Sequence, residues 1–290
     1  MLVGDAGSRA TVTRSVVRGT LADGAGLYGW AASAEAGGAL VIEDSALVDS
    51  REKGVSVGRA GSSAKLTKSL VARTQASAGG NAHAIDVQDG ASLELVESSV
   101  ALNVGEGVAV DLKSTATIVR SIVRDTLENP SGNDGHGVEV GGGAKVTLED
   151  SVLLGNHEVA LSTSGKGTVV DATRTHIVET SSSTQGGFGV AAGAQSGAHL
   201  TFKDGMVTRA FYYGFFADGR TSLVEIERTL VSDVRVIDKL GRCLDVQSGA
   251  VMKVKDSTVQ KCGTDGVVVD GQGGEASLEA DHLLVQRTSS

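Results

Sequence analysis

The stretch Val146-Thr147-Leu148-Glu149-Asp150-Ser151-Val152-Leu153 contains the pattern on which the fold depends. Apolar and polar residues alternate up to Leu148, a charged residue and a serine follow, and apolar residues then resume. Such period-two alternation predicts a strand with one buried face and one solvated face. The same pattern returns in Leu93-Glu94-Leu95-Val96-Glu97-Ser98-Ser99-Val100, which indicates an internal repeat.

The serine of this pattern serves as an anchor for locating further copies along the whole chain. The anchors are Ser15, Ser45, Ser69, Ser98, Ser121, Ser151, Thr175, Gly205, Thr229, Ser257 and Asp281. Successive anchors are 23–30 residues apart, and long and short intervals alternate. The residues five and three positions before each anchor, and two positions after it, are apolar in every copy. Each copy therefore predicts a strand with the same buried face.

A second short strand precedes the anchored one and often opens with glycine, as in Gly54-Val55-Ser56-Val57 and Gly137-Val138-Glu139-Val140. One such coil cannot bury its apolar face alone, but coils stacked in parallel, about 4.8 Å apart, share a continuous core. Parallel crossovers are nearly always right-handed. The sequence therefore predicts an all-β, right-handed parallel β-helix of about eleven coils, as a single domain over residues 1–290. Leucine-rich repeats are the main alternative, but their Leu/Asn consensus and helical periodicity are missing.

The residue before each anchor changes the sign of its charge at every coil. The residues are Arg14, Asp44, Lys68, Glu97, Arg120, Asp150, Arg174, Asp204, Arg228 and Asp256. In a β-helix they stack in one column, where like charges would repel one another and alternating charges make each residue a partner of both neighbours. We interpret this column as structural.

The composition excludes several classes of partner. The formal net charge is −9 and no basic stripe is visible, which argues against nucleic acid and anionic membranes. No apolar run approaches the roughly 18 residues of a membrane span, so membrane insertion is not expected. The N-terminus lacks the pattern of a signal peptide. A bridge between Cys243 and Cys262 is possible but not favoured, because they fall at different positions of neighbouring coils.

The G-V-x-V and T-L-x-x-S-x-V patterns resemble the right-handed β-helix superfamily, or pectin-lyase-like fold. More narrowly, they resemble repeat segments of large bacterial surface and secreted proteins. The resemblance implies an extracellular or cell-surface location and a non-enzymatic structural or adhesive scaffold, with polysaccharide or another surface protein as partner. The alternative that it implies is a polysaccharide-active enzyme, either a lyase or a glycoside hydrolase.

The catalytic motifs of that superfamily are matched only in fragments. Gly135-His136-Gly137 matches G-H-G of the hydrolases, and Thr264-Asp265 half-matches N-T-D. These fragments lie about five coils apart, roughly 24 Å, which is too far for one glycosidase carboxylate pair. The single proline, Pro130, does not lie in the R-x-P-x-x-R motif of the lyases. Whether the chain is an enzyme stays open, and the scaffold is the favoured interpretation.

Four of the five long coils carry their extra residues just before the short, often glycine-opened strand that precedes the anchored one. These loops are Thr74–His83, Asp125–His136, Thr180–Phe188 and Asp233–Arg242, and the first long coil instead carries its extra length after Trp30. Loops on a rigid scaffold are common places for function. We therefore expect a functional site on the edge from which these loops project.

Three of the loops end on a cation followed by an outward carboxylate. The candidate binding residues are His83, Asp86, His136, Glu139, Arg242 and Asp245. They could line a shallow carbohydrate or ligand groove, and His136 with Glu139 could act as a catalytic acid/base pair. The structural alternative is that the cations only neutralise the carboxylates and orient the loop ends.

Two further features have a functional and a structural interpretation. Loop 125–136 gathers oxygen ligands in Asp125, Glu128 and Asp134, beside Asn129 and Asn133, so Ca²⁺ is conceivable, although the spacing fits no known calcium loop. Otherwise no cofactor is expected.

The cluster Phe211-Tyr212-Tyr213-Gly214-Phe215-Phe216 could stack on a sugar or could fill the core at a packed turn.

The two ends of the chain lack a capping helix or a polar cap coil. An uncapped β-helix exposes strand edges and a cross-section of its core. We therefore expect either a segment of a longer protein or end-to-end self-association.

Overall fold

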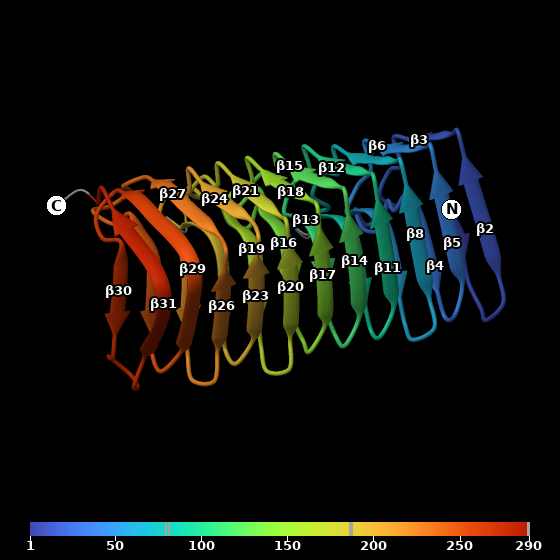
Figure 1. Cartoon of the computed structure of the whole chain (residues 1–290). Coiled ribbons are helices and arrows are strands. Elements are labelled where there is room, and N and C mark those ends of the chain that lie inside the picture. Colours follow the sequence, from blue (N-terminus) through green and yellow to red (C-terminus); the bar gives the residue numbers. More distant parts are fainter. Residues whose placement is uncertain (79, 81, 186–187, 289–290) are drawn as a thin grey trace.

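The computed structural model describes residues 1–78, 80, 82–185 and 188–288, which wind into a β-solenoid of stacked coils (Figure 1). One face is an eleven-stranded sheet, called sheet A, and a twenty-stranded sheet, called sheet B, forms the rest of the wall. The paired strands of both sheets run parallel, as β10 with β13 and β11 with β14. The described residues contain no helix, and so none that could cross a membrane. The parallel β-helix predicted from the repeat is confirmed.

Each coil contributes one strand to sheet A. These strands are β1 (Leu2–Val3), β4 (Ala32–Glu35), β7 (Lys53–Gly58), β10 (His83–Gln88), β13 (Glu106–Val110), β16 (His136–Val140), β19 (Glu158–Ser164), β22 (Gly189–Gln195), β25 (Tyr213–Asp218), β28 (Arg242–Gln247) and β30 (Val267–Asp270).

Most coils contribute two strands to sheet B, with the anchor residue at the bend between them. The first strands are β2 (Arg9–Thr13), β5 (Ala39–Glu43), β8 (Ser63–Thr67), β11 (Ser92–Val96), β14 (Thr115–Val119), β17 (Lys145–Glu149), β20 (Val169–Thr173), β23 (His199–Lys203) and β26 (Leu223–Glu227). The second strands are β3 (Val16–Arg18), β6 (Ala46–Val48), β9 (Leu70–Ala72), β12 (Ser99–Ala101), β15 (Ile122–Arg124), β18 (Val152–Leu154), β21 (His176–Val178), β24 (Met206–Thr208) and β27 (Leu230–Val234). The last two coils have one long strand each, β29 (Val251–Cys262) and β31 (Ser277–Gln286).

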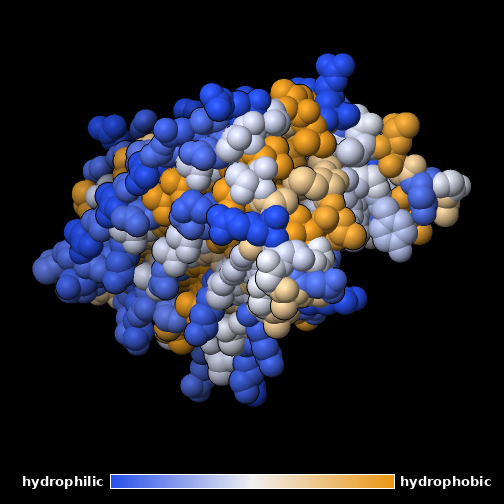
Figure 2. All heavy atoms as spheres, turned by 90° about the vertical axis from the view of Figure 1, so that its right-hand side faces the viewer, coloured by the Kyte–Doolittle hydropathy of each residue, from blue (hydrophilic) through white to orange (hydrophobic). Residues whose placement is uncertain are grey.

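Inward side chains of equivalent positions lie on top of one another and form one continuous core. Leu95 of β11 pairs in register with Leu66 of β8 and with Ile118 of β14, and all three are fully buried. Inward side chains are less covered in the first coil, where Ala10, Val12 and Val17 are only partly buried. Apolar surface is accordingly visible across the N-terminal end (Figure 2).

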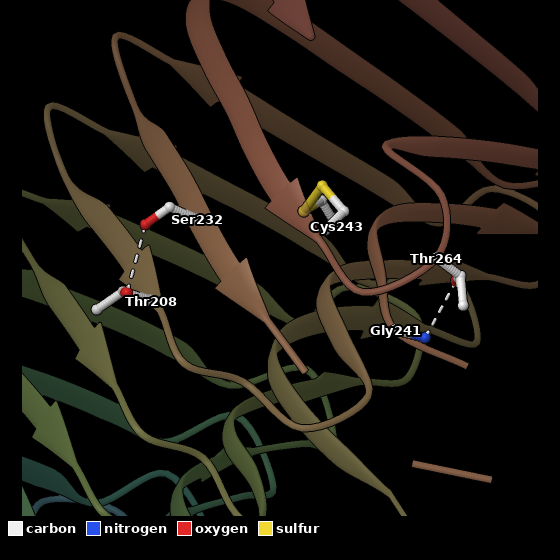
Figure 3. Close-up of a disulfide and its surroundings, with 6 residues drawn as sticks. Thr208, Ser232, Gly241, Cys243 and Thr264 are labelled. Atoms are coloured by element: carbon white, nitrogen blue, oxygen red, sulfur yellow. Dashed lines mark hydrogen bonds between the residues drawn. A yellow bond between two sulfur atoms is a disulfide. The ribbon is translucent and has the colours of Figure 1, made fainter. Parts of the chain in front are cut away.

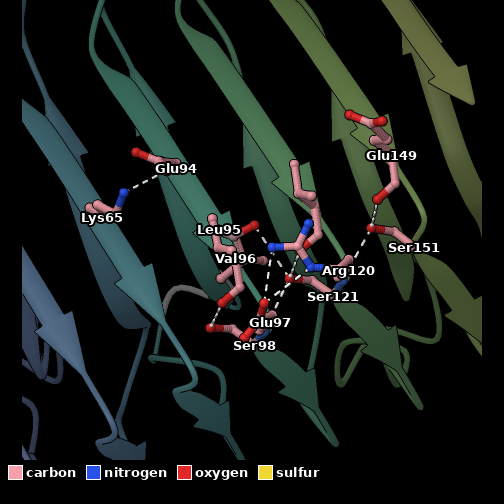
Figure 4. Close-up of polar contacts among 11 residues, drawn as sticks. Lys65, Glu94, Leu95, Val96, Glu97, Ser98, Arg120, Ser121, Glu149 and Ser151 are labelled. Carbon is pink, nitrogen blue, oxygen red and sulfur yellow. Dashed lines mark hydrogen bonds and ion pairs between the residues drawn. The ribbon is translucent and has the colours of Figure 1, made fainter.

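The anchor serines form a hydrogen-bond ladder, which explains their place in the repeat. The Oγ of Ser121 accepts the backbone N–H of Ser98, one coil earlier, at 3.1 Å, and its hydroxyl donates to the carbonyl of Val119 at 2.9 Å (Figure 4). The Oγ of Ser151 accepts the N–H of Ser121 in the same way, at 3.2 Å. The ladder satisfies buried backbone groups at the bend, which would otherwise cost free energy.

The alternating charge column lies directly before this ladder. All ten of its residues adopt left-handed backbone conformations, with φ between 46° and 54°. Arg120 contacts Glu97 at 2.9 Å (Figure 4), and Arg174 and Arg228 contact Asp150 and Asp204, each at 2.6 Å. The predicted alternation therefore produces ion pairs. Each of these arginines bonds to the acid of the coil before it, whereas contact with both neighbours was expected.

The predicted register of the last coil is wrong by two residues. Strand β31 pairs with β29 so that Leu283, and not Asp281, lies opposite the anchor Ser257. The cause is the turn over residues 271–276, which is longer than the turn over residues 248–250 of the coil before. The shift places His282 beside Asp256, with Nδ1 and Oδ1 3.1 Å apart, so the charge column extends by one more coil.

The prediction for the first long coil is also wrong. Its extra residues form the segment 19–31, between β3 and β4, which is the place that the loops occupy in the other long coils. Successive loops touch, because the N–H of Ala78 donates to the carbonyl of Gly26 at 3.1 Å and that of Gln185 donates to Gly132 at 3.1 Å. All five long coils therefore project their loops from one edge of sheet A.

Cys243 and Cys262 form a disulfide, which was not the favoured prediction (Figure 3). Their Cα atoms are 5.5 Å apart although they occupy different positions of the repeat. Cys262 ends β29 at the corner where the chain turns towards sheet A, and Cys243 lies at the start of β28 beside the same corner. The corner brings these two positions together, which the sequence spacing did not indicate.

The same corner holds a column of buried polar side chains that the sequence analysis did not identify. The members are Ser50, Thr74, Asn103, Thr126, Asn156 and Thr180, each at most 1% exposed. The Oδ1 of Asn156 accepts the N–H of Thr126 at 3.2 Å, and its Nδ2 donates to the carbonyl of Val123 at 3.2 Å. Asn103 bonds in the same way to the N–H of Thr74 and the carbonyl of Val71, so the two asparagines complete the backbone hydrogen bonding where the strands of sheet B end.

Candidate functional site

The register of sheet A places the predicted binding residues in two adjacent columns on its outer face. Asp86, Glu139 and Asp245 lie in one column, which Ala109, Ser162, Gly193 and Phe216 complete. His83 and His136 lie in the next column, with Glu106 between them. Arg242 and Asp245 are four coils beyond Glu139, about 19 Å away, so the six residues form two separate groups.

The first group is a charged cluster on β7, β10, β13 and β16. His136 Nδ1 is 2.7 Å from Glu139 Oε2, and His83 Nδ1 is 3.0 Å from Glu106 Oε2. Lys53 forms an ion pair with Asp86. Lys53 and Glu106 come from short coils without a long loop, so a search restricted to loop ends missed them. Their position just before the apolar part of the strand, which His83 and His136 share, is the signal that could have found them.

The electrostatics of the cluster follow from burial and from pairing. Burial lowers the pKa of His136, but its hydrogen bond to Glu139 and the negative charges of Glu139 and nearby Glu158 outweigh that effect and raise the pKa to about 10. Burial acts to raise the pKa of Glu139, but the hydrogen bond and the charge of His136 leave that pKa below its ordinary value. At neutral pH the pair is therefore an imidazolium and a carboxylate. A protonated imidazole cannot accept a proton, so His136 is unsuited to act as a general base in this state.

Glu106 is the exception among these carboxyl groups. Burial raises the pKa of Glu106, the close contact with His83 and its charge lower it in part, and the facing carboxylate of Glu139 contributes to the increase. For His83 itself, burial is the largest influence and lowers the pKa, but the close contact with Glu106 and the negative charges of Glu106 and Asp86 together outweigh burial, so the net pKa is raised. The cluster is thus a network of opposite charges in which one carboxyl group holds its proton more tightly than usual.

The second group is a covered ion pair. Asp245 accepts hydrogen bonds from Arg242 Nη1 and from Gln247 Nε2, both at 2.6 Å, and is fully buried. Asp86 is 6% exposed and accepts a hydrogen bond from Gln88 Nε2 at 3.0 Å. We had expected both carboxylates on a solvated face. They do lie on the outer face of sheet A, but the neighbouring cations and glutamines cover them.

An aromatic surface lies between the two groups. Tyr213 and Phe216 of β25 stack with their ring centroids 5.3 Å apart, and Tyr212 contacts Phe188 edge-on at 5.4 Å. Phe215, in contrast, points inward and packs against Phe202 in the core at 5.1 Å. The aromatic cluster therefore contributes both to the core and to the surface: one ring fills the core, and several others cover the outer face of sheet A.

Two hollows on this face meet at the His136–Glu139 pair. The first has a volume of about 390 Å³ and is lined by charged residues that include Lys53, Asp86 and Glu139. The second has a volume of about 320 Å³ and is lined by His136, Glu158, Phe188, Tyr213, Phe216 and Asp218, among others. The two hollows lie one after the other along sheet A, from β7 to β25, and are together called the sheet A groove below.

A larger trough of about 950 Å³ follows the bend of sheet B. Its charged walls come from the alternating column, in which Arg120 pairs with Glu97 and Arg174 pairs with Asp150. The described residues that line the trough include no aromatic side chain, so it offers less for recognition than the sheet A groove.

The predicted calcium ligands have separate partners. Asp125 Oδ2 is 2.6 Å from Arg124, and Asp134 accepts a hydrogen bond from Asn129 at 2.6 Å. Glu128 accepts hydrogen bonds from both the backbone N–H and the hydroxyl of Thr184, in the next long loop. Within the described part of the chain, the one group of three or more ligand residues that converge closely is Glu106, His136 and Glu139.

The comparison with protein families gives one result. The model of the family described as right-handed β-helix region matches residues 2–177 and 131–282. A comparison with curated proteins finds no match.

Proposed function

This chain belongs to the right-handed β-helix family, and from that premise we propose that it is a rigid, non-enzymatic scaffold whose sheet A groove binds an extended carbohydrate. The observation that carries the proposal is the stacked pair Tyr213 and Phe216 in a hollow that acidic and amide side chains also line. Aromatic faces pack against the apolar faces of sugar rings, while carboxylates and amides accept and donate hydrogen bonds to hydroxyl groups.

The dimensions of the groove suit a chain-like ligand. It extends over seven strands of sheet A, from β7 to β25. At about 4.8 Å per coil this corresponds to roughly 29 Å, which is room for an oligosaccharide and more than one monosaccharide needs. The strands are hydrogen-bonded in register, so the groove is formed before the ligand arrives and little ordering free energy is lost on binding.

The charges of the groove favour neutral or amine-bearing sugars over acidic ones. Its cations, Lys53, His83 and His136, each lie against a carboxylate. Asp111 and Asp218 line the groove without an ion pair to any described residue. A ligand that carries carboxylates would meet unpaired acids and no free cation, which opposes binding.

The location that we propose is extracellular or at the cell surface. A disulfide such as Cys243–Cys262 persists in oxidising compartments and is rare in the cytosol of most organisms. A surface scaffold with a glycan-binding face would act as an adhesive module.

The second candidate is a polysaccharide lyase or glycoside hydrolase. What favours it is that the pKa of Glu106 is raised while that of neighbouring Glu139 is lowered, as in pairs of catalytic carboxyl groups. Against it, the ligand atoms of these residues and of His136 lie within 4.8 Å of one another. Glycosidases need about 5–5.5 Å between the carboxyl groups for retention and about 6.5–9.5 Å for inversion.

Calorimetric titration of the full chain tests the proposal with three oligosaccharides of equal length: an oligoglucosamine, a neutral β-glucan and an oligogalacturonate. We expect the first or second to bind and the third to bind at least tenfold more weakly. Phe216→Ala should weaken binding about tenfold, the equivalent of 1.4 kcal/mol. Phe211→Ala is the matched control, because Phe211 packs against Arg235 and does not line the groove.

Three outcomes would count against a binding scaffold. They are an absence of binding to all three oligosaccharides, a preference for the oligogalacturonate, and an equal loss of affinity in Phe216→Ala and Phe211→Ala. Release of reducing ends or of unsaturated products from any of the oligosaccharides would favour the enzyme instead.

A further inference from the structure

Three potential metal ligands converge on the outer face of sheet A. Glu106 of β13 and His136 and Glu139 of β16 each offer one ligand atom, and these atoms lie within 4.8 Å of one another. Glu106 and His136 are register partners in adjacent strands. The separation of their backbones is therefore set by the sheet, and only short side-chain adjustments are needed to bring the ligand atoms together.

We propose that Glu106, His136 and Glu139 form a binding site for a divalent transition-metal ion of the Zn²⁺ type. One imidazole nitrogen with two carboxylate oxygens is a ligand set that suits Zn²⁺, Mn²⁺ or Fe²⁺. Ca²⁺ and Mg²⁺ prefer oxygen ligands alone and more of them, so the imidazole argues against those ions.

The present distances are close to those that a metal ion requires. Tetrahedral Zn²⁺ has ligands at about 2.0–2.2 Å, which places ligand atoms roughly 3.4 Å from one another. His136 Nδ1 and Glu139 Oε2 are 2.7 Å apart, so their hydrogen bond would open by less than about 1 Å. Two of the three side chains are glutamates, whose rotatable bonds permit such an adjustment.

The surroundings of the three residues resemble the outer shell of a metal site. His83 Nδ1 lies 3.0 Å from Glu106 Oε2, and Glu158 Oε1 lies 3.9 Å from His136 Nε2. Such contacts orient ligand side chains and raise metal affinity. His136 Nε2 is buried and has no hydrogen-bond partner among the described residues.

Three protein ligands leave one coordination position open. Glu106 and Glu139 also line the charged hollow of about 390 Å³, so the open position would face the sheet A groove. A water molecule or a hydroxyl group of a groove ligand could occupy it. The site itself depends only on the three side chains and does not require the proposed carbohydrate function.

Metal titration of the tag-free, chelator-treated full chain tests this site, with ZnCl₂ as the probe and without any glycan. Calorimetry or competition with a chromophoric chelator should give one equivalent of bound Zn²⁺. His136→Ala and Glu106→Gln should each reduce the affinity at least tenfold, and the isosteric Glu139→Gln should do the same. CaCl₂ and MgCl₂ should bind at least tenfold more weakly than ZnCl₂ at this site.

The matched controls are His199→Ala and Glu225→Gln. His199 and Glu225 form another His–Glu pair, at 2.9 Å on sheet B, and belong to no converging group of three ligands among the described residues. Both controls should retain the full equivalent of Zn²⁺.

Failure to bind Zn²⁺, binding that survives His136→Ala, or equal affinity for CaCl₂ would each overturn the proposal. Thermal unfolding of every variant establishes that a loss of metal is not a loss of fold. Since the groove variant Phe216→Ala leaves all three ligands in place, its Zn²⁺ affinity should be unchanged, which separates this site from the carbohydrate proposal.

Discussion

The ring of Phe202 occupies the space that a side chain at Gly205 would need. A Cβ atom at Gly205 would lie 2.4 Å from Cε1 of Phe202 and 2.5 Å from the carbonyl oxygen of Thr175. Gly205 stands at an anchor position that most coils fill with serine or threonine. The glycine at this anchor position is therefore a consequence of the large Phe202 side chain in the core of this coil.

Restoring the repeat at that position should destabilise the protein. We expect Gly205→Ser to lower the free energy of unfolding by about 1–3 kcal/mol, because the added atoms overpack the bend. The loss should be smaller when Phe202→Leu is also present, and a double-mutant cycle of urea unfolding measures the difference. Equal losses in the two backgrounds would show that Phe202 is not the cause.

Asn156 should be needed for stability at the corner of the coils. Asn156→Leu removes the acceptor for the N–H of Thr126 and the donor to the carbonyl of Val123, both buried. An unsatisfied buried polar group costs about 1–3 kcal/mol, so this substitution should lower the free energy of unfolding by at least that amount. Asn133→Leu, in an exposed loop, is the control and should have little effect on thermal unfolding.

The disulfide should stabilise the C-terminal coils in particular. Cys243 and Cys262 are 19 residues apart, and closing a loop of that size contributes about 3 kcal/mol in the chain-entropy model. In Cys243→Ala/Cys262→Ala, amide exchange should become faster in β28–β31, while coils before Ser121 should be unaffected, because each coil contacts only its neighbours. Uniformly faster exchange along the chain would contradict this local effect.

The charge column should make the protein more sensitive to acid. A hydrogen bond from Arg228 lowers the pKa of Asp204, and one from Arg174 lowers the pKa of Asp150. A lowered carboxyl pKa contributes stability above the unfolded-state value of about 3.9, and this stability is lost as the pH falls through the folded-state pKa. Melting temperatures between pH 2 and pH 7 should therefore drop below about pH 4.

Asp204→Asn provides the control for that pH dependence. The variant lacks the titrating group, so its melting temperature should lie below that of the unmodified chain at pH 7 and should approach it at low pH. A constant difference between the two proteins at every pH would show that Asp204 acts through packing and not through its charge.

The sequence predicted some residues of the candidate site and missed others. The periodicity of Val138 and Val140 implies that Glu139 points outward, and the structure agrees. The sequence pattern did not identify Glu106, because a short coil carries no loop to draw attention to it. The pairing of Glu106 with His83 and His136 depends on the stacking of three coils that are 23 and 30 residues apart in the chain.

The sequence by itself determined the architecture, because alternation along a strand and repetition between coils are local patterns that leave one way to bury Leu66, Leu95 and Ile118 together. Only the tertiary structure decided the pairing of Cys243 with Cys262, the register of Leu283 and the convergence of Glu106, His136 and Glu139. The physical reason is that the first set depends on which face a side chain occupies. The second set depends on turn lengths and corner geometry, which change the residues that lie opposite one another in neighbouring coils but leave the alternation along each strand unchanged.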